Sequence, residues 1–309
     1  MLRYVMRRLL SIILTLWVIA TGTFVLMHAI PGGPFTTEKQ LPPEIMKNIE
    51  ERYHLNDPLW KQYVDHMKNL LRGDLGPSYK YEGRTVNDII REGFPVSAQL
   101  GGLAVLAALL LGIPLGIIAA LNRGKLVDNF VMVLGTIGYS VPSFIMATLL
   151  MLIFSVWLGW LPAAMWGTPQ QAIMPTICLM FLPMAFIARM TRSSMIEVLE
   201  QDYIRTARAK GLSERAVIYR HALKNAIMPV ASWVGPLAAG LLTGTFVVEF
   251  IFAIPGLGRY FTTSIYNRDY TTIMGTTIFY SVWLVLFNLI VDILYGFLDP
   301  RIKYVEERG

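Results

Sequence analysis

Residues that could do chemistry are few in this chain, and they are scattered. The carboxylate side chains inside the long apolar runs are Glu249 and Asp292, with the amide of Asn288 near the second. A charge at the middle of a bilayer costs about 2.5–3.5 kcal/mol, so such groups usually face a cavity or a partner, and a proton relay would use them. Both lie near the ends of their runs, where the cost falls, so we favour a structural role for each.

Other chemistries find little support. His54 and His66 share one polar segment, where solvated surface histidines are a simpler interpretation than a metal pair. Cys178 is the single cysteine and cannot form an internal disulfide. The sequence lacks the Gly-x-x-x-x-Gly-Lys-Ser/Thr loop that cradles nucleotide phosphates, so it gives this chain no ATP site. We therefore expect no catalytic, metal or cofactor residues, and a chain that is not an enzyme by itself.

Composition indicates a membrane protein. The chain has 309 residues, of which 54% are hydrophobic and 16% are charged, whereas ordinary globular chains carry roughly 25% charged residues. Its apolar residues form long runs, which predicts an all-α polytopic membrane protein. The formal charge of +6 could suggest nucleic acid, but basic loops on the cytoplasmic side explain it more simply.

The apolar runs predict six transmembrane helices, at residues 9–30, 96–121, 130–160, 173–190, 227–252 and 273–298. A signal peptide is the alternative for the first run, but the run exceeds the ~7–15 residues of a signal core and no small-x-small site follows it. Pro142 is expected to kink the third helix, and Pro175 and Pro183 to break the fourth.

A polar segment at residues 31–95 is expected to form a small helical scaffold outside the membrane. Residues 43–53 and 59–71 are predicted to be short amphipathic helices, and Thr85 with Asp88 could cap a third. Residues 253–272 are expected to be a loop.

Basic residues concentrate in the N-terminus, in the loop with Arg123 and Lys125, in residues 192–229 and in the tail, which predicts both termini in the cytoplasm.

The most distinctive polar stretch is residues 192–229, which we call the hook. Apolar residues recur at helical spacing in its first half, and Gly211 follows a turn that ends in Arg208 and Lys210. Ser213 can cap a second helix, which ends where Pro229 opens the next apolar run. The pattern therefore predicts two helices joined at a glycine, a shape that another protein could grip.

A DNA-binding helix-turn-helix is the alternative for the hook, because the stretch is basic and contains a glycine turn. Both ends of the hook run within a few residues into predicted membrane helices. A recognition helix held there could hardly enter a major groove, so we expect no nucleic-acid partner.

In the hook and in several other stretches, the chain resembles a known family, the permease subunits of bacterial peptide importers of the ATP-binding-cassette (ABC) class. It is most similar to the first of the two oligopeptide or dipeptide permease subunits, over almost its whole length. The stretches that carry the resemblance are, in order, Pro31-Gly32-Gly33-Pro34, Asp57-Pro58-Leu59-Trp60-Lys61-Gln62-Tyr63, Gly73-Asp74-Leu75-Gly76, Ser140-Val141-Pro142-Ser143-Phe144, Asp202-Tyr203-Ile204-Arg205-Thr206-Ala207-Arg208-Ala209-Lys210-Gly211-Leu212, Ile254-Pro255-Gly256-Leu257-Gly258, Asn267-Arg268-Asp269-Tyr270 and Leu298-Asp299-Pro300-Arg301.

The resemblance implies a type I ABC importer permease fold in the bacterial cytoplasmic membrane. It implies a core domain at residues 96–298, after an N-terminal part at 1–30 and the external scaffold at 31–95, with a tail at 299–309. The implied partners are a second permease subunit, two ATP-binding subunits that hold ATP and Mg²⁺, an external substrate-binding protein, a peptide substrate and membrane lipid. The implied ATPase-coupling residues are Tyr203, Arg205, Thr206, Ala207, Lys210, Gly211 and Leu212.

The hook departs from the general loop of such importers, because Arg205 and Thr206 stand where that loop has Glu and Ala, and Pro229 comes late.

A peptide path must accept varied side chains, and methionine-rich sites re-pack easily. The expected path residues are Met146, Met180, Met184 and Glu249, although ordinary core methionines would give the same pattern. A transporter driven alone by ions or protons is the alternative function, but it would need buried titratable groups at mid-span.

Overall fold

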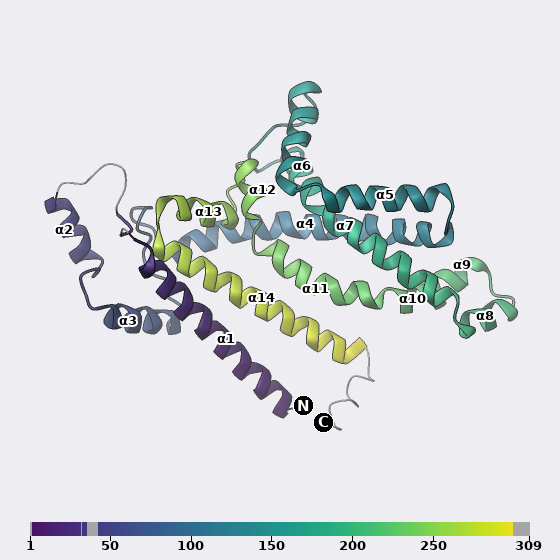
Figure 1. Cartoon of the computed structure of the whole chain (residues 1–309), viewed down its shortest axis with the longest axis horizontal. Helices are drawn as coiled ribbons and strands as arrows, with labels where there is room; N and C mark the ends of the chain where they lie inside the picture. The colour runs from purple at the N-terminus through teal and green to yellow at the C-terminus, as the bar shows by residue number, and fades with distance from the viewer. Residues whose placement is uncertain (1, 32, 36–42, 299–309) are drawn as a thin grey trace. The chain divides into compact units, whose positions relative to one another are not determined.

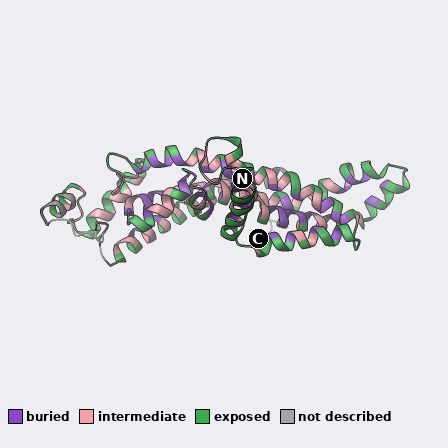
Figure 2. Ribbon diagram, turned by 90° about the horizontal axis from the view of Figure 1, so that it is seen from above, coloured by how far each residue is buried: buried purple, intermediate pink, exposed green. Residues whose placement is uncertain are grey.

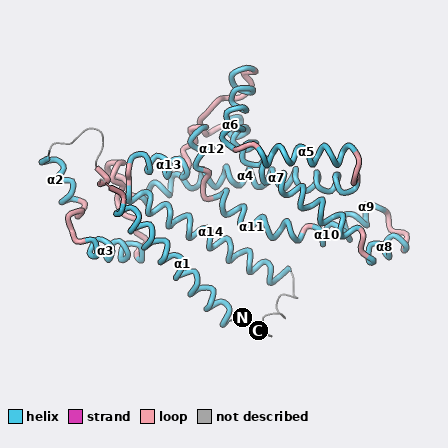
Figure 3. Tube along the Cα trace, in the orientation of Figure 1, coloured by secondary structure: helices cyan, strands magenta, loops and turns pink. Residues whose placement is uncertain are grey.

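A computed structural model describes residues 2–31, 33–35 and 43–298 of the chain. Within these residues the regular elements are helices, and the only bridge is the isolated pair Pro77 and Thr85 (Figures 1 and 3). The predicted tail at residues 299–309 and the side chain of Asp292 lie outside the description. In chain order the elements are α1 (Leu2–Ala29), α2 (Pro43–Arg52), α3 (Leu59–Leu71), α4 (Val86–Leu121), α5 (Leu126–Ser140), α6 (Ser143–Leu150), η1 (Met151–Trp157), α7 (Pro169–Leu199), α8 (Asp202–Ala209), α9 (Glu214–Ala216), η2 (Val217–Ala222), α10 (Leu223–Ala226), α11 (Met228–Leu242), α12 (Phe246–Ile251), α13 (Leu257–Asn267) and α14 (Tyr270–Leu298).

The helices form two compact units. The first unit comprises Met1–Val96 and Pro255–Val285, and the second comprises Ser97–Ile254 and Leu286–Gly309. Along single helices, buried and exposed residues alternate with the helical turn, as expected where one face meets a neighbouring helix (Figure 2). The described part of the chain has five helices long and apolar enough to cross a membrane, or up to six if the bent pair α5 and α6–η1 is one span. The all-helical membrane fold predicted from the sequence is confirmed.

The second membrane helix begins ten residues earlier than predicted. α4 starts at Val86, so the third external helix and the second span are one continuous helix of 36 residues. Thr85 caps its start as expected: the backbone N–H of Asp88 donates to Thr85 Oγ1 (3.2 Å), and that of Thr85 donates to Asp88 Oδ2 (3.0 Å). Hydropathy located only the apolar part of this helix, because its first turns are polar.

The predictions for the third and fourth spans need correction. The expected kink at Pro142 is a bend of 104° between α5 and α6, and Val141 before the proline is extended, as the ring of a following proline requires. The fourth span is not short or broken, because α7 runs for 31 residues with Pro175 and Pro183 inside it. Both prolines are buried among neighbouring helices, which is where membrane helices tolerate them.

Two further predictions were wrong in detail. Residues 253–272 are not a loop, because α13 fills most of them and ends at Asn267, followed by Arg268 in the left-handed conformation. The fifth span is interrupted: α11 ends at Leu242 and α12 begins at Phe246, with Gly244 at a φ of +127° between them. In both cases glycines and prolines mark where a helix is interrupted. They do not show how few residues lie outside the helices there.

The first unit is organised around the carboxylate of Asp269, which is fully buried. It accepts hydrogen bonds from Ser78 Oγ, from the backbone N–H of Tyr79 (3.1 Å) and from Thr272 Oγ1 (2.8 Å). Burial, with the charge of Asp269 as a further cause, raises the pKa of Tyr79 to about 12. Asp269 therefore ties the polar segment after α3 to the start of α14.

His66 is not the solvated surface side chain that the sequence suggested. Its ring centroid lies 5.7 Å from that of Phe24 in α1. Burial lowers its pKa, and nearby His28 acts in the same direction, so His66 is neutral at pH 7. His54 is exposed, as expected. Among the described residues, no group of three or more His, Cys, Asp or Glu side chains could hold a metal ion.

In the second unit, α7 is the central helix. A Cβ atom at Gly116 of α4 would lie 2.5 Å from the carbonyl oxygen of Ala188, so only glycine permits this approach. α5 is held by an ion pair: Arg192 Nη2 donates to Asp128 Oδ2 over 2.7 Å, and Arg192 Nε donates to Asp128 Oδ1. The N–H of Gly124 donates to the same carboxylate (2.9 Å). This bidentate pair lies where α7 enters the hook.

We predict that Asp128→Ala destabilises the protein much more than Glu200→Ala. Asp128 is almost fully buried, and its loss leaves the Arg192 guanidinium without its partner, at a cost of roughly 1–3 kcal/mol. Glu200 pairs with Arg123 over 2.9 Å, but both side chains are exposed, and such pairs contribute about 0–1 kcal/mol. Thermal unfolding of the purified proteins in nanodiscs measures the difference, and equal losses would contradict the assignment.

Candidate functional site: the hook between α7 and α11

The last turns of α7, from Arg192 to Leu199, are the first part of the hook. α7 stops at Leu199, and α8 starts at Asp202 after a turn in which Gln201 is extended. The sequence had suggested one helix through the first half of the hook, so this break at Glu200 and Gln201 is a correction. Its effect is to turn α8 out of the line of α7, so that α8 is a separate short helix.

Gly211 closes α8 as predicted. The N–H of Gly211 donates to the carbonyl of Arg208 (2.9 Å), and that of Leu212 donates to the carbonyl of Ala207 (3.4 Å). These two bonds form a Schellman motif, which needs a left-handed residue after the helix. Gly211 has a φ of +80°, and a Cβ there would meet open space. The position is therefore constrained by its backbone conformation alone.

The turn after Gly211 is fixed from both sides. Ser213 caps α9 as predicted, and its Oγ accepts from the N–H of Ala216 (3.4 Å). Across the turn, Arg208 Nε donates to Glu214 Oε1 over 2.8 Å. Both charges are largely exposed, so this pair contributes little energy but holds α8 beside α9.

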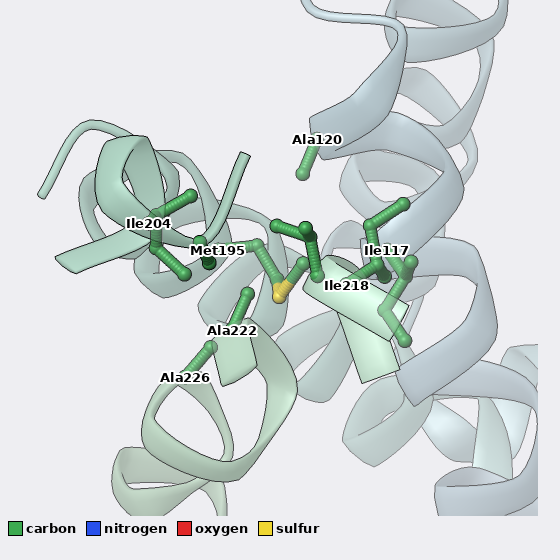
Figure 4. Close-up of a cluster of buried hydrophobic side chains, with 9 residues drawn as sticks. Ile117, Ala120, Met195, Ile204, Ile218, Ala222 and Ala226 are labelled. Carbon is green, nitrogen blue, oxygen red and sulfur yellow. The ribbon is translucent and has the colours of Figure 1, made fainter. Parts of the chain in front are cut away.

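A buried cluster anchors the hook to the membrane helices (Figure 4). Ile204 and Ala207, on one face of α8, pack in a cluster whose other members are Ile117, Ala120, Met195, Val217, Ile218, Ala222 and Ala226. These residues come from α4, α7, η2 and α10, so one cluster joins the hook to the helices before and after it. Full burial of Ile204 is worth about 1.5–3 kcal/mol. Any movement of α8 must therefore pass to α4 and α7, or break this cluster.

The structure divides the seven predicted coupling residues into two groups. Ala207 is buried in the cluster and cannot touch a partner directly. The other six are exposed: Tyr203, Arg205, Thr206, Lys210, Gly211 and Leu212. Tyr203 is positioned by Asn225, whose Nδ2 donates to its hydroxyl over 2.8 Å. α8 thus has an inner face that anchors it and an outer face that carries aromatic, cationic and apolar side chains.

The four predicted path residues do not form one cluster. Met184 is buried in a group with Ala108, Ile187 and Val230, and Met180 packs at its edge. Met146 is half-buried on α6.

Glu249 is fully buried on α12, where its Oε1 accepts from Ser97 Oγ and from the N–H of Thr245, both over 2.9 Å. These contacts agree with the structural role that we favoured for it.

Sequence reasoning predicted Ala207 as a coupling residue but missed Ile204 and the inward face that the two residues share. Ile204 and Ala207 face inward together because they are three apart on a helix, a spacing that the sequence shows but does not distinguish from a lipid-facing pair. The pairs Arg208–Glu214 and Asp128–Arg192 join residues 6 and 64 apart, and the second could be found only from the structure.

Comparison with known proteins identifies the class of membrane protein to which this hook belongs. Residues 112–304 match the family model of binding-protein-dependent transport system inner membrane components, and residues 1–101 match the model of its N-terminal part. The chain belongs to this family. It is therefore a multi-pass protein of the inner membrane and a transport component rather than an enzyme, and its family works with binding-protein and ATPase partners.

Three permease proteins are similar to this chain over 98% of its length. The dipeptide transport system permease protein DppB of Bacillus subtilis is 52% identical over 303 residues, which is 98% of each chain. The oligopeptide transport system permease proteins OppB of Haemophilus influenzae and Escherichia coli are 46% and 47% identical over 98% of this family member and the full length of each relative.

Solved structures share the fold. A chain of the methionine ABC transporter MetNI, in an inward-facing conformation, has a TM-score of 0.56 at 20% identity, covering 68% of this chain and 96% of that one. An amino acid ABC transporter solved with histidines has a TM-score of 0.54 at 16% identity, covering 67% and 93%. At these identities the comparison supports the fold alone.

We predict that Gly211→Val sharply lowers transport while the protein still inserts into the membrane. A β-branched residue in the left-handed conformation costs about 1–2 kcal/mol, which shifts the population of the native bend roughly 5–30-fold. Gly211→Asn is the matched control, because asparagine tolerates this conformation. Substrate uptake by vesicles with equal amounts of each variant measures the effect. Full uptake by Gly211→Val would show that the bend is dispensable.

Proposed function

We propose that this family member is the membrane-spanning permease subunit of an ATP-driven importer of oligopeptides or dipeptides. The observation that carries the proposal is the 46–52% identity, over 98% of the chain, to permease proteins of dipeptide and oligopeptide transport systems. The resemblance noted in the sequence was to the same group of proteins.

The proposed complex contains a second, similar permease subunit, with the peptide path between the two. Two ATP-binding subunits dock on the hooks and hold ATP and Mg²⁺, and an external binding protein delivers the peptide. The chain lacks a nucleotide-binding loop and belongs to a binding-protein-dependent family, so both energy and substrate must reach it from partners. Both termini and the hook lie in the cytoplasm, because the basic residues concentrate there.

The proposed division of the chain follows from this arrangement. Residues 31–95 form the external scaffold, although α4 starts within their predicted range, and residues 96–298 form the core that carries the hook. The outer face of α8, with Tyr203, Arg205 and Lys210, contacts the ATPase. Ile204 and Ala207 pass the movement inward through the buried cluster to α4 and α7. Among the proposed path residues, half-buried Met146 and Met180 line the path more readily than fully buried Glu249.

Reconstitution tests this proposal. Vesicles that contain the chain, the second permease and the ATPase subunits should accumulate a labelled dipeptide or oligopeptide only with ATP inside and the binding protein outside. Vesicles that contain this chain alone should accumulate none, with ATP or with a proton gradient. Uptake by the pure chain driven by protons would contradict the proposal and favour an ion-coupled transporter.

A further inference from the structure

α3 carries an apolar stripe that none of the described helices covers. Trp60, Val64 and Leu71 are exposed, with 69%, 38% and 87% of their surface accessible. Residues four and eleven positions apart lie on nearly the same side of a helix, so the three form one row along α3. Monomeric soluble proteins rarely expose rows of large apolar side chains, so such a row indicates a partner or a membrane.

The neighbouring face of α3 is fixed against α1. Tyr63 shares a hydrogen bond of 2.8 Å between its hydroxyl and Thr21 Oγ1. Gln62 Oε1 lies 3.2 Å from His28 Nε2 of α1, and the ring of His66 is tilted against that of Phe24, with the ring centroids 5.7 Å apart. These contacts set the rotation of α3, and with it the direction of the stripe.

The same contacts place the C-terminal end of α3 beside the membrane part of α1. Leu71 lines an apolar groove of about 750 Å³ together with Ile13 and Trp17 of α1 and with Ile278 and Val282 of α14. These four residues belong to candidate membrane spans. Trp17 is twelve residues from the end of α1 at Ala29, or about 18 Å along the helix. The bilayer hydrocarbon is about 30 Å thick, so Trp17, which lines the same groove as Leu71, lies at the depth of the hydrocarbon.

The charges of α3 lie where an interfacial helix would need them. Lys61, Asp65 and Lys68 are all exposed and fall on the side of the helix away from α1, beyond the stripe. Lys61 pairs with Asp57 over 2.9 Å, and Lys68 with Asp65 over 3.5 Å. Tryptophan and lysine are the residues that helices place at the boundary between lipid and water.

From these observations we propose that α3 is an interfacial helix whose Trp60–Val64–Leu71 stripe lies in the lipid of the leaflet reached by the C-terminal end of α1. The occupant of the stripe is phospholipid, because its exposed apolar surface continues directly into that of the membrane helices. α3 would then fix the depth and tilt of α1 from the side, as an amphipathic helix with one apolar face does. The inference rests on membership of the membrane family and not on the transported substrate.

Spin labelling of the assembled transporter tests the proposal. In a Cys178→Ser background, with the cysteines of the partner subunits replaced, a single nitroxide is attached at Val64→Cys or Leu71→Cys. Asp65→Cys and Lys68→Cys on the same helix are the matched controls. The complexes are placed in nanodiscs of phosphatidylethanolamine and phosphatidylglycerol, and only variants with normal transport are compared. Collision with lipid-soluble oxygen and with a water-soluble nickel complex is measured by power saturation.

Labels at 64 and 71 should collide several-fold more with oxygen than with nickel, and labels at 65 and 68 should show the reverse preference. A nickel preference at 64 and 71 would overturn the proposal, because the stripe would then face water. Protection of 64 and 71 from both reagents would also overturn it, because a protein surface would then cover the stripe.

Discussion

The hook depends on the burial of one face of α8 in a cluster shared with α4, α7, η2 and α10. A helix of eight residues is too short to be stable in water alone, so α8 exists only because Ile204 and Ala207 are buried. The same burial makes the hook a mechanical link. A partner that moves the outer face of α8 must move the membrane helices or expose this cluster, and exposing Ile204 alone would cost about 1.5–3 kcal/mol.

Two further constraints make this link stiff. The bidentate pair of Asp128 and Arg192 fixes α5 to α7 at the first residue of the hook, and at Gly116 α4 approaches α7 so closely that no side chain fits between them. Within the hook, the Schellman turn at Gly211 and the cap at Ser213 satisfy the backbone groups that the helix ends would otherwise leave without partners. The proposed coupling through the hook thus depends on rigid packing within one unit.

The helix caps and helix ends that depend on neighbouring residues could be predicted from the sequence. Gly211, Ser213 and the Thr85–Asp88 capping box were predicted correctly, because each acts within a few residues of chain. The bend at Val141 was predicted only as a kink, since a proline fixes its neighbour's conformation but not the angle between two helices. The ion pair of Asp128 and Arg192, the inward face of α8 and the burial of His66 depend on residues distant in sequence, and no local pattern indicates them. Glycines and prolines near 255–258 hid α13 because they mark its start rather than a long loop.

The central claim is that the outer face of α8 receives the ATPase subunit. The most direct measurement is photo-crosslinking from a benzophenone attached at Thr206→Cys in the Cys178→Ser background, in the assembled and active transporter. Thr206 is exposed on α8, and exposed His54, in the turn between α2 and α3, provides the control position. The account predicts that the label at 206 captures the ATP-binding subunit and that the label at 54 does not. Absence of this product at 206, or equal capture from 54, would contradict it.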